Sequence, residues 1–259
     1  MGLKEIFTIT RKTKLLIVVL ACISITGFLI AYFYYDYRNK AEDPRIVAAR
    51  YKLKKFDDLM KARMYEQALF LLDTIDSIYR KADGYATSFE PGIVFNNRGS
   101  IYLSMALYDS LISQEERQHL LALADTNLKS GIEIYMNWID SAGALPEQQI
   151  RKNIEPYFNE SVASLKGKNI HRIFNKRVAD IMNAQIETPR RLSVCYTNLG
   201  IVQRHQLRQE EALKSYIQAI KLWKDNFTAR NNFNVLMGKP PEDRSIIDQL
   251  FPPERIKKD

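Results

Sequence analysis

Residues 195–223 read CYTNLGIVQRHQLRQEEALKSYIQAIKLW, and this stretch decides the fold prediction for the whole chain. Most of it is polar, but small, apolar and aromatic residues recur at helical intervals. They are Leu199, Gly200, Ala212, Tyr216 and Ala219. Small residues let two helices approach closely, while larger residues three and four positions away fill the groove between them. The spacing therefore predicts two antiparallel helices that interlock.

This pattern resembles the tetratricopeptide repeat, a pair of helices about 34 residues long. The repeat has an aromatic residue and a leucine-glycine pair in its first helix, and alanine, an aromatic residue and alanine in its second. Tyr196 and the five residues above match it in register across 193–226, whereas Gln203 stands where the family usually has tyrosine. The resemblance implies a stack of helix pairs, an α-solenoid, with a concave groove along the first helices.

Further copies are expected because a single helix pair cannot bury its own apolar face. A copy at 49–82 places Tyr65, Ala68 and Leu72 in its second helix. Phe56 stands where the family has a small residue, so we expect looser or rotated packing in this pair.

A second copy, at 92–138, carries Phe95, Gly99 and Tyr102 in its first helix. Its second helix, with Ala124, Leu128 and Gly131, fits only after an insertion. Ser113 followed by Glu116 forms a capping box, which predicts a long second helix from about Gln114. The segment 227–237 predicts the first helix of a fourth, incomplete unit.

Two sequence pairs predict helix starts. Asp43-Pro44 and Thr188-Pro189 each combine a capping side chain with a proline suited to the first helical position. We therefore expect a repeat domain at 44–238 with a loop at 83–91. Residues 139–188 do not fit the repeat and predict an insert of one or two helices. Residues 239–259 carry two Pro-Pro pairs and predict an extended tail that packs on the stack or docks on a partner.

The N-terminus predicts a membrane anchor. Residues 15–35 contain no charged residue and, at about 1.5 Å per residue, form a helix long enough to cross a bilayer. Five aromatic residues follow or end this stretch, as at a membrane interface, whereas a cleaved signal peptide has a shorter apolar region followed by small residues. We expect a basic segment at 1–14, an uncleaved single-pass helix at 15–35 and a linker at 36–43.

Charges beside this helix give a weaker prediction of orientation. Arg11, Lys12 and Lys14 precede it, and the basic residues after it are diluted by acids. The positive-inside rule then places the large domain on the non-cytoplasmic side, which is the periplasm in a bacterium. These N-terminal charges account for part of the net charge of +8, so that value does not by itself indicate nucleic-acid binding.

Three asparagines are candidate contacts for a partner. Asn97, Asn198 and Asn232 each occupy the sixth position of a predicted first helix. The resemblance implies that this position faces the concave groove, where an amide can donate to and accept from an extended peptide. Asparagine is also frequent there in members of the family that bind no peptide, so both interpretations stay open.

A basic run forms a second candidate surface. Its members are Lys166, Lys168, Arg172, Lys176 and Arg177, with no acid between them. They predict either the solvated face of a helix or a contact with anionic lipid or an acidic partner. Nucleic acid is disfavoured because no aromatic residues alternate with these charges for stacking on bases.

Signals of catalysis are scarce. The three histidines lack metal-ligand spacing, and no phosphate-binding glycine loop or nucleophile elbow occurs. Cys22 lies in the apolar run, and Cys195 lies in a repeat helix where a small buried residue is expected. We therefore predict no enzyme activity, no cofactor, no metal and no small-molecule substrate.

Together these features predict a membrane-anchored scaffold or adaptor that is an accessory subunit of a multiprotein assembly, whose partners are membrane-bound proteins and the bilayer. The alternative is a chaperone-like or targeting receptor that captures extended segments in the groove. A lipid-regulated or enzymatic protein is a third class, which would require activity that survives in a purified soluble fragment from residue 40 onward.

Overall fold

The computed structural model describes residues 11–39 and 41–243. Within these residues every regular element is a helix and none is a strand, which confirms the all-α prediction. The α-helices are α1 (Arg11–Asn39), α2 (Val47–Lys61), α3 (Tyr65–Lys81), α4 (Glu90–Tyr108), α5 (Gln114–Ala142), α6 (Glu147–Ile154), α7 (Ile170–His205), α8 (Gln209–Leu222) and α9 (Phe227–Leu236). Two 3₁₀ turns, η1 (Glu155–Tyr157) and η2 (Ala163–Leu165), lie between α6 and α7.

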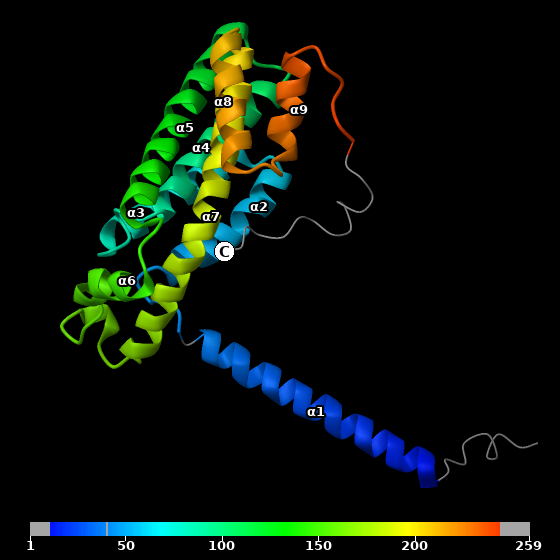
Figure 1. Cartoon of the computed structure of the whole chain (residues 1–259), viewed down its shortest axis with the longest axis vertical. Helices are drawn as coiled ribbons and strands as arrows, with labels where there is room; N and C mark the ends of the chain where they lie inside the picture. Colours follow the sequence, from blue (N-terminus) through cyan, green and yellow to red (C-terminus); the bar gives the residue numbers. More distant parts are fainter. Residues whose placement is uncertain (1–10, 40, 244–259) are drawn as a thin grey trace, which may run out of the picture.

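Helix α1 stands apart from the helical body (Figure 1). Its segment Arg11–Tyr35 has a mean hydropathy of 2.6, and none of that apolar segment is buried. The helix is therefore long and apolar enough to cross a membrane. It continues to Asn39, so the first four residues of the expected linker are helical instead.

The other helices pack mainly on their neighbours in chain order. Contacts join α2 to α3, α3 to α4 and α4 to α5, and then join α5 to α7, α7 to α8 and α8 to α9. Figure 1 shows α4, α5, α7 and α8 side by side through the body, with α6 at the end nearest α1. Helix α4 contributes to two apolar clusters, with Val94 and Ile101 in one and Leu103 and Ala106 in the other.

The same C-terminal cap closes α2, α7 and α9. After α2, Arg63 has φ 56°, its N–H donates to Met60 O, and the N–H of the next residue donates to Leu59 O. Leu207 (φ 63°) and Gly238 (φ 70°) repeat this pattern with identical offsets. The two bonds define a Schellman motif. Helices from three distant parts of the sequence thus end in one conformation, although only Gly238 has the usual residue for it.

A second recurring feature is the close approach of a glycine to a large side chain. A Cβ on Gly200 of α7 would lie 2.5 Å from Cε1 of Tyr216 on α8. On α4, a Cβ on Gly99 would lie 2.5 Å from Cγ of Leu128 on α5. In both pairs the large side chain follows a buried alanine by four residues, Ala212 or Ala124. The interlock expected from the opening stretch therefore occurs in two helix pairs.

The first helix pair has a large residue where the other two pairs have glycine. Phe56 of α2 is buried in the same cluster as Ala68 and Leu72 of α3. Leu72 follows Ala68 by four residues, as Leu128 follows Ala124, so this pair carries large side chains on both helices. Gln203, the other departure from the pattern, is also buried, and its Oε1 accepts a hydrogen bond of 2.7 Å from Ser215 Oγ.

The expected helix start at Thr188-Pro189 is wrong. Helix α7 runs without interruption from Ile170 to His205, with Pro189 inside it and Thr188 fully buried. An interior proline costs a helix about 3 kcal/mol or more. Ile181 before it and Leu192 after it lie in one apolar cluster, and their burial offsets that cost by keeping both halves of α7 on the same core.

This continuity also changes the insert. Residues 139–188 comprise the end of α5, α6, the two 3₁₀ turns and the first half of α7. Helix α5 begins at the expected residue, because Ser113 Oγ accepts a hydrogen bond of 3.0 Å from Glu116 N. The loop expected at 83–91 ends at Phe89, since α4 already includes Glu90.

The expected helix at 227–237 is α9, and Asn226 fastens it to the body. Asn226 Oδ1 accepts from Ala229 N at 3.0 Å, while its Nδ2 donates to Ser193 Oγ and Thr197 Oγ1 of α7 at 2.8 and 2.9 Å. Beyond α9 the chain folds back, and the Glu242 N–H donates to Asn231 Oδ1 at 2.8 Å. The rest of the Pro-rich tail, 244–259, lies outside the described residues.

The glycine interlock leads to a test of stability. We expect Gly200→Ala to destabilise the domain by about 1–3 kcal/mol, because the added methyl group overlaps the Tyr216 ring. Alanine favours a helix over glycine by about 1 kcal/mol, so a site without a clash would gain stability. The measurement is the thermal midpoint of the helical circular-dichroism signal in detergent.

Gly131→Ala is the matched control. Its Cβ would lie no closer than 3.3 Å to the nearest atom, Asn96 N, so its thermal midpoint should fall less. A midpoint for Gly200→Ala at or above that of the wild type would contradict the interlock.

Candidate functional site

Two of the three predicted asparagines are joined through a residue that the sequence pattern missed. Asn198 Nδ2 of α7 donates to Ser100 Oγ at 3.0 Å and to Asn96 Oδ1 at 3.4 Å on α4. Asn96 Nδ2 in turn lies 3.5 Å from Asn97 Oδ1. All four side chains are half-buried. Asn96, Asn97, Ser100 and Asn198 therefore form one polar strip between α4 and α7, here called the amide face.

Asn232 does not belong to this strip. Its Oδ1 accepts from Arg204 Nη1 at 3.3 Å, and its Nδ2 donates to Thr228 O at 2.9 Å within its own helix. The structure thus brings Asn97 and Asn198 together through Asn96 and leaves Asn232 on α9 with a different partner. A repeat pattern alone does not show which of the neighbouring residues Asn96 and Asn97 faces α7, because this depends on how α4 is rotated about its axis.

A cavity of about 240 Å³ lies between α2, α4 and α7. Tyr79, Phe89 and Ile93 form apolar walls, and the charged lining residues are Arg50, Arg191, Glu90, Asp180 and Glu187, of which Arg50 is paired with Asp180. Among the described residues, Arg191 Nη1 is buried and makes no hydrogen bond. Arg191 precedes Asn198 by two helical turns and lies on the same side of α7. The cavity therefore offers an unused donor close to the amide face.

The predicted basic run does not form one surface. Arg177 is buried, with a side chain 2% exposed, and pairs with Glu90. Lys176 pairs with Asp180 on the next turn of α7. Neither side chain is available to a partner, which corrects the expectation for these two residues. Lys166 and Lys168 are exposed on the loop before α7, and Arg172 lies in its first turn.

Arg177 lies at the centre of a buried polar cluster. Its Nη2 donates to Gly84 O at 3.1 Å and to Ser88 Oγ at 3.0 Å, and its guanidinium lies 4.0 Å from the Tyr85 ring centroid. Burial favours the neutral guanidine, but Glu90 outweighs it and raises the pKa of Arg177, so the group stays charged. A loop between α3 and α4 is thereby fixed to the insert.

The segment that follows α1 is fixed at the same place. Ala41, Asp43 and Ile46 are buried. Asp43 forms an ion pair of 2.6 Å with Arg45 and accepts a hydrogen bond of 2.9 Å from Tyr85 Oη. Arg45 Nη1 donates to Tyr157 O at 3.0 Å. The expected break after α1 is therefore present, but the helix start expected at Asp43-Pro44 is wrong. Helix α2 begins at Val47 after Ile46, without a side-chain cap, because the Asp43 carboxylate is bonded to Arg45 and Tyr85 instead.

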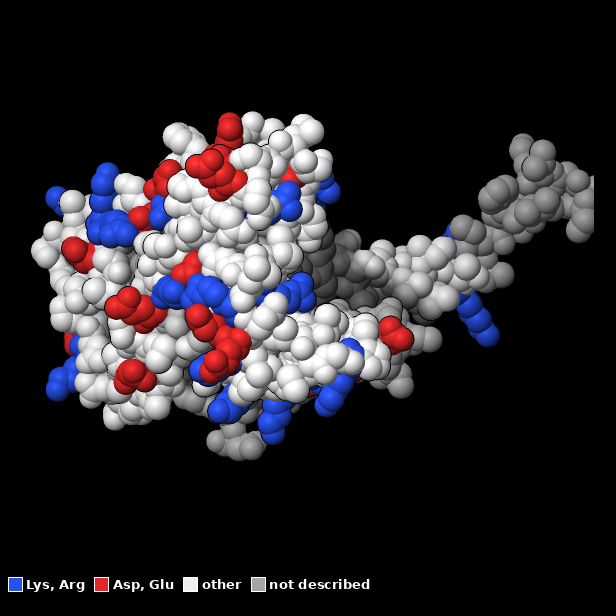
Figure 2. All heavy atoms as spheres, turned by 90° about the horizontal axis from the view of Figure 1, so that it is seen from above, with Lys and Arg blue, Asp and Glu red and all other residues white. Residues whose placement is uncertain are grey.

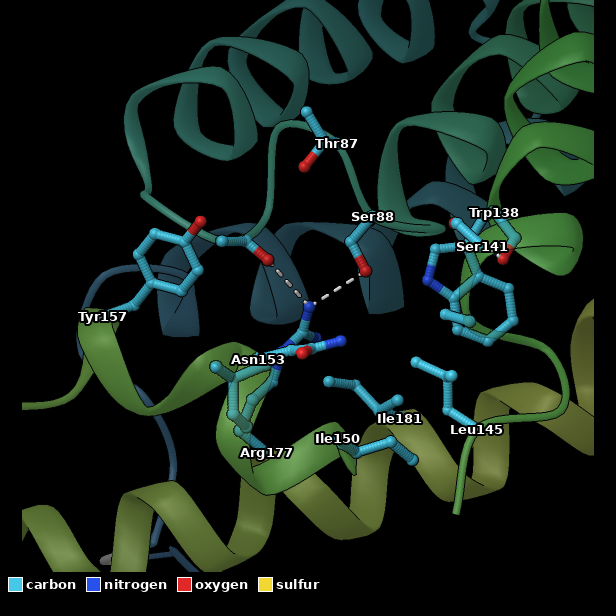
Figure 3. Close-up of a pocket in the computed structure, with 13 residues that line it drawn as sticks. Thr87, Ser88, Trp138, Ser141, Leu145, Ile150, Asn153, Tyr157, Arg177 and Ile181 are labelled. Carbon is cyan, nitrogen blue, oxygen red and sulfur yellow. Dashed lines mark hydrogen bonds between the residues drawn. The ribbon is translucent and has the colours of Figure 1, made fainter. Parts of the chain in front are cut away.

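A second cavity, of about 220 Å³, opens beside Arg177 between the α3–α4 loop, α5, α6 and α7. Figure 3 shows Arg177 extending toward Ser88, with Trp138, Leu145 and Ile181 on the apolar side. Arg177 is already bonded to Glu90, Ser88 and Gly84. It therefore presents no unpaired charge to this cavity. The geometry of the cavity indicates a structural junction between the α3–α4 loop and helices α5, α6 and α7.

Cys195 and the histidines show no catalytic arrangement within the described part of the chain. Cys195 is fully buried, and burial raises the pKa of its thiol, so the nucleophilic thiolate is disfavoured. Burial lowers the pKa of His205, and the charges of Arg204 and Arg117 lower it further. The described residues contain no cluster of three His, Cys, Asp or Glu side chains suited to a metal.

Figure 2 shows basic and acidic side chains interspersed over the visible face of the body, without a continuous basic surface. A comparison with models of known protein families finds none that matches this chain, and searches of curated proteins and of solved structures find no significant match. Conclusions about function therefore depend on the geometry.

The Arg177–Glu90 pair predicts a large effect on stability. We expect Arg177→Met to destabilise the domain by about 3–5 kcal/mol, because Glu90 is left buried without its counter-charge. The double variant Arg177→Met/Glu90→Gln should recover part of this loss, and thermal midpoints measure both. Arg80→Met is a matched control, since its pair with Asp76 is 61% exposed on the arginine side. If the loss in the double variant equalled the sum of the losses in Arg177→Met and Glu90→Gln, the coupling of Arg177 to Glu90 would be contradicted.

Asp43 predicts a loss of stability in acid. Burial raises its pKa, but the hydrogen bonds and charge of Arg45 and the Tyr85 hydroxyl lower it below its usual 3.8. The stabilisation is complete above pH 3.8 and is lost as the pH falls through the folded-state value. We expect the thermal midpoint of Asp43→Asn to fall less steeply than that of the wild type below this pH. Parallel curves would contradict the assignment.

Proposed function

We propose that this chain is a membrane-anchored scaffold or adaptor of the tetratricopeptide-repeat type, which holds partner proteins beside a bilayer. The observation that carries this proposal is the burial of Ala41, Asp43 and Ile46 beside the α3–α4 loop and the segment between α6 and α7. This segment follows α1 directly and fastens the helical body to the end of a helix long enough to span a membrane. The body is thereby confined to the bilayer surface.

The recurring helix ends support the repeat type. Helices α2, α7 and α9 close with the same Schellman motif, and the α4–α5 and α7–α8 pairs share a glycine approach. We infer three helix pairs, α2–α3, α4–α5 and α7–α8, with α9 as a closing helix. Such stacks expose extended helical faces to partners and require no chemistry of their own.

Attachment of the helical stack to a membrane is what makes it effective as a scaffold. Confinement to a membrane raises the effective concentration of the stack toward other membrane-bound proteins. We propose a non-enzymatic accessory subunit of a multiprotein assembly, with the body on the non-cytoplasmic side of a single-pass anchor. Affinity capture of the intact chain from membranes, after crosslinking, tests this. Recovery of the chain only as an isolated monomer would contradict it.

The amide face supports a second candidate, a receptor for extended segments. Among the described residues, Asn97 Nδ2 donates no hydrogen bond, and Arg191 Nη1 is an unused donor two turns from Asn198. A peptide backbone carries the carbonyl acceptors that these groups lack. In this alternative a client lies along α4 and α7 and crosses the cavity beside Arg191.

One variant set separates the two candidates. Asn97→Ala, Asn198→Ala and Asn232→Ala in one chain should leave a scaffold with the same crosslinked partners, because assembly uses other helical faces. A receptor should lose its clients about tenfold or more, at roughly 1 kcal/mol or more for each peptide hydrogen bond removed.

Asn127→Ala is the control, since Asn127 Nδ2 bonds only its own helix, to Leu123 O at 2.8 Å on α5. Unchanged partners in the triple variant, with an unchanged thermal midpoint, support the scaffold. Loss in the triple variant alone, with folding retained, supports the receptor and contradicts the scaffold.

A further inference from the structure

The loop before α7 exposes two lysines from a rigid base. Leu165 is fully buried, and its carbonyl accepts a hydrogen bond of 3.0 Å from Lys168 N. Gly167 between the lysines has φ 70°, and no atom lies within 4 Å of the position of a Cβ there. Lys166 and Lys168 are therefore exposed on a turn that the buried Leu165 fixes to the core.

These lysines lack acidic partners within the described residues. Neither of them forms an ion pair of 4.0 Å or less with a described residue, although nearby acids exist. Glu42 and Asp180 are occupied by Arg50, and Asp180 is also paired with Lys176. Glu42 and Asp180 are thus neutralised inside the domain. Glu155 and Glu160, in the segment between α6 and α7, are exposed and form no ion pair with Lys166 or Lys168 among the described residues, so the charge of the two lysines is left for an external partner.

The loop lies beside the point where the chain leaves α1. A cavity of about 370 Å³ is lined by Glu42, Pro44 and Val47 on one side and by Lys168 and Arg172 on the other. Two residues separate the end of α1 at Asn39 from Glu42, and the three steps along the chain span at most about 11 Å. Electrostatic attraction in physiological salt extends over about 8 Å, so this cavity lies close to the range of lipid headgroups.

We propose that Lys166, Lys168 and the first turn of α7 at Arg172 bind anionic phospholipid headgroups of the bilayer that α1 spans. Charge complementarity selects this occupant, since Lys166 and Lys168 are exposed cations without an acidic partner among the described residues and the surface nearest to them is the bilayer around the anchor. The inference rests on α1 being a membrane span. It adds a second attachment, which fixes the rotation of the body about the anchor as well as its distance.

Hydrogen exchange of the full-length chain in lipid nanodiscs tests the contact. Discs of phosphatidylcholine alone are compared with discs that also contain phosphatidylglycerol. We expect the backbone amides of 163–169 to exchange more slowly in the anionic discs, and high salt to abolish the difference because it screens the lysines.

Lys166→Gln/Lys168→Gln should weaken this protection by about fivefold for each lysine removed. Lys221→Gln/Lys224→Gln removes the same charge from exposed lysines at the end of α8 and should leave it unchanged. Equal exchange in the two kinds of disc, or protection that appears only when an acidic protein is added, would overturn the inference.

Flotation of the same samples with lipid separates this result from a failure of the anchor. A chain that does not float contradicts the membrane anchor itself. A chain that floats without lipid-dependent protection contradicts the headgroup site and leaves the anchored scaffold standing.

Discussion

The close approach of helices at glycines, of which Gly200 and Gly99 are two, is the constraint on which the body depends. Tyr216 and Leu128 pack against backbone, at positions where any Cβ on Gly200 or Gly99 would overlap them. Burial alone does not specify this geometry, because apolar faces pack at several angles and distances. The paired glycine and large side chain select one arrangement, and Tyr216 is so enclosed that burial raises its pKa to about 12.

Much of this arrangement was predictable because it is local in sequence. Gly200 and Tyr216 are 16 residues apart, and the start of α5 depends on Ser113 and Glu116 alone. The helix start predicted at Pro189 is wrong for a physical reason. A proline favours helix starts, but it is tolerated within a helix when both halves of that helix are packed on one core. The sequence pattern contains the proline but not that core.

The candidate site was less predictable because its contacts join distant segments. Arg177 and Glu90 are 87 residues apart, so an arginine in a basic run gives no sign that it is buried and paired. Asn96 links Asn97 to Asn198 across 102 residues, and a repeat pattern cannot distinguish it from its neighbour. Lys166 and Lys168 remained candidates because no distant acid reaches them among the described residues.

The uninterrupted α7 has a mechanical consequence. It contains 36 residues, which corresponds to a rod about 54 Å long. Its first half lies beside the segment that follows α1, and its second half carries α8 and α9. A tilt imposed at the α1 end is therefore transmitted as a lever to the opposite end of the body, with Pro189 as its least stiff point. An array of separate short helices would instead absorb such a tilt at its turns.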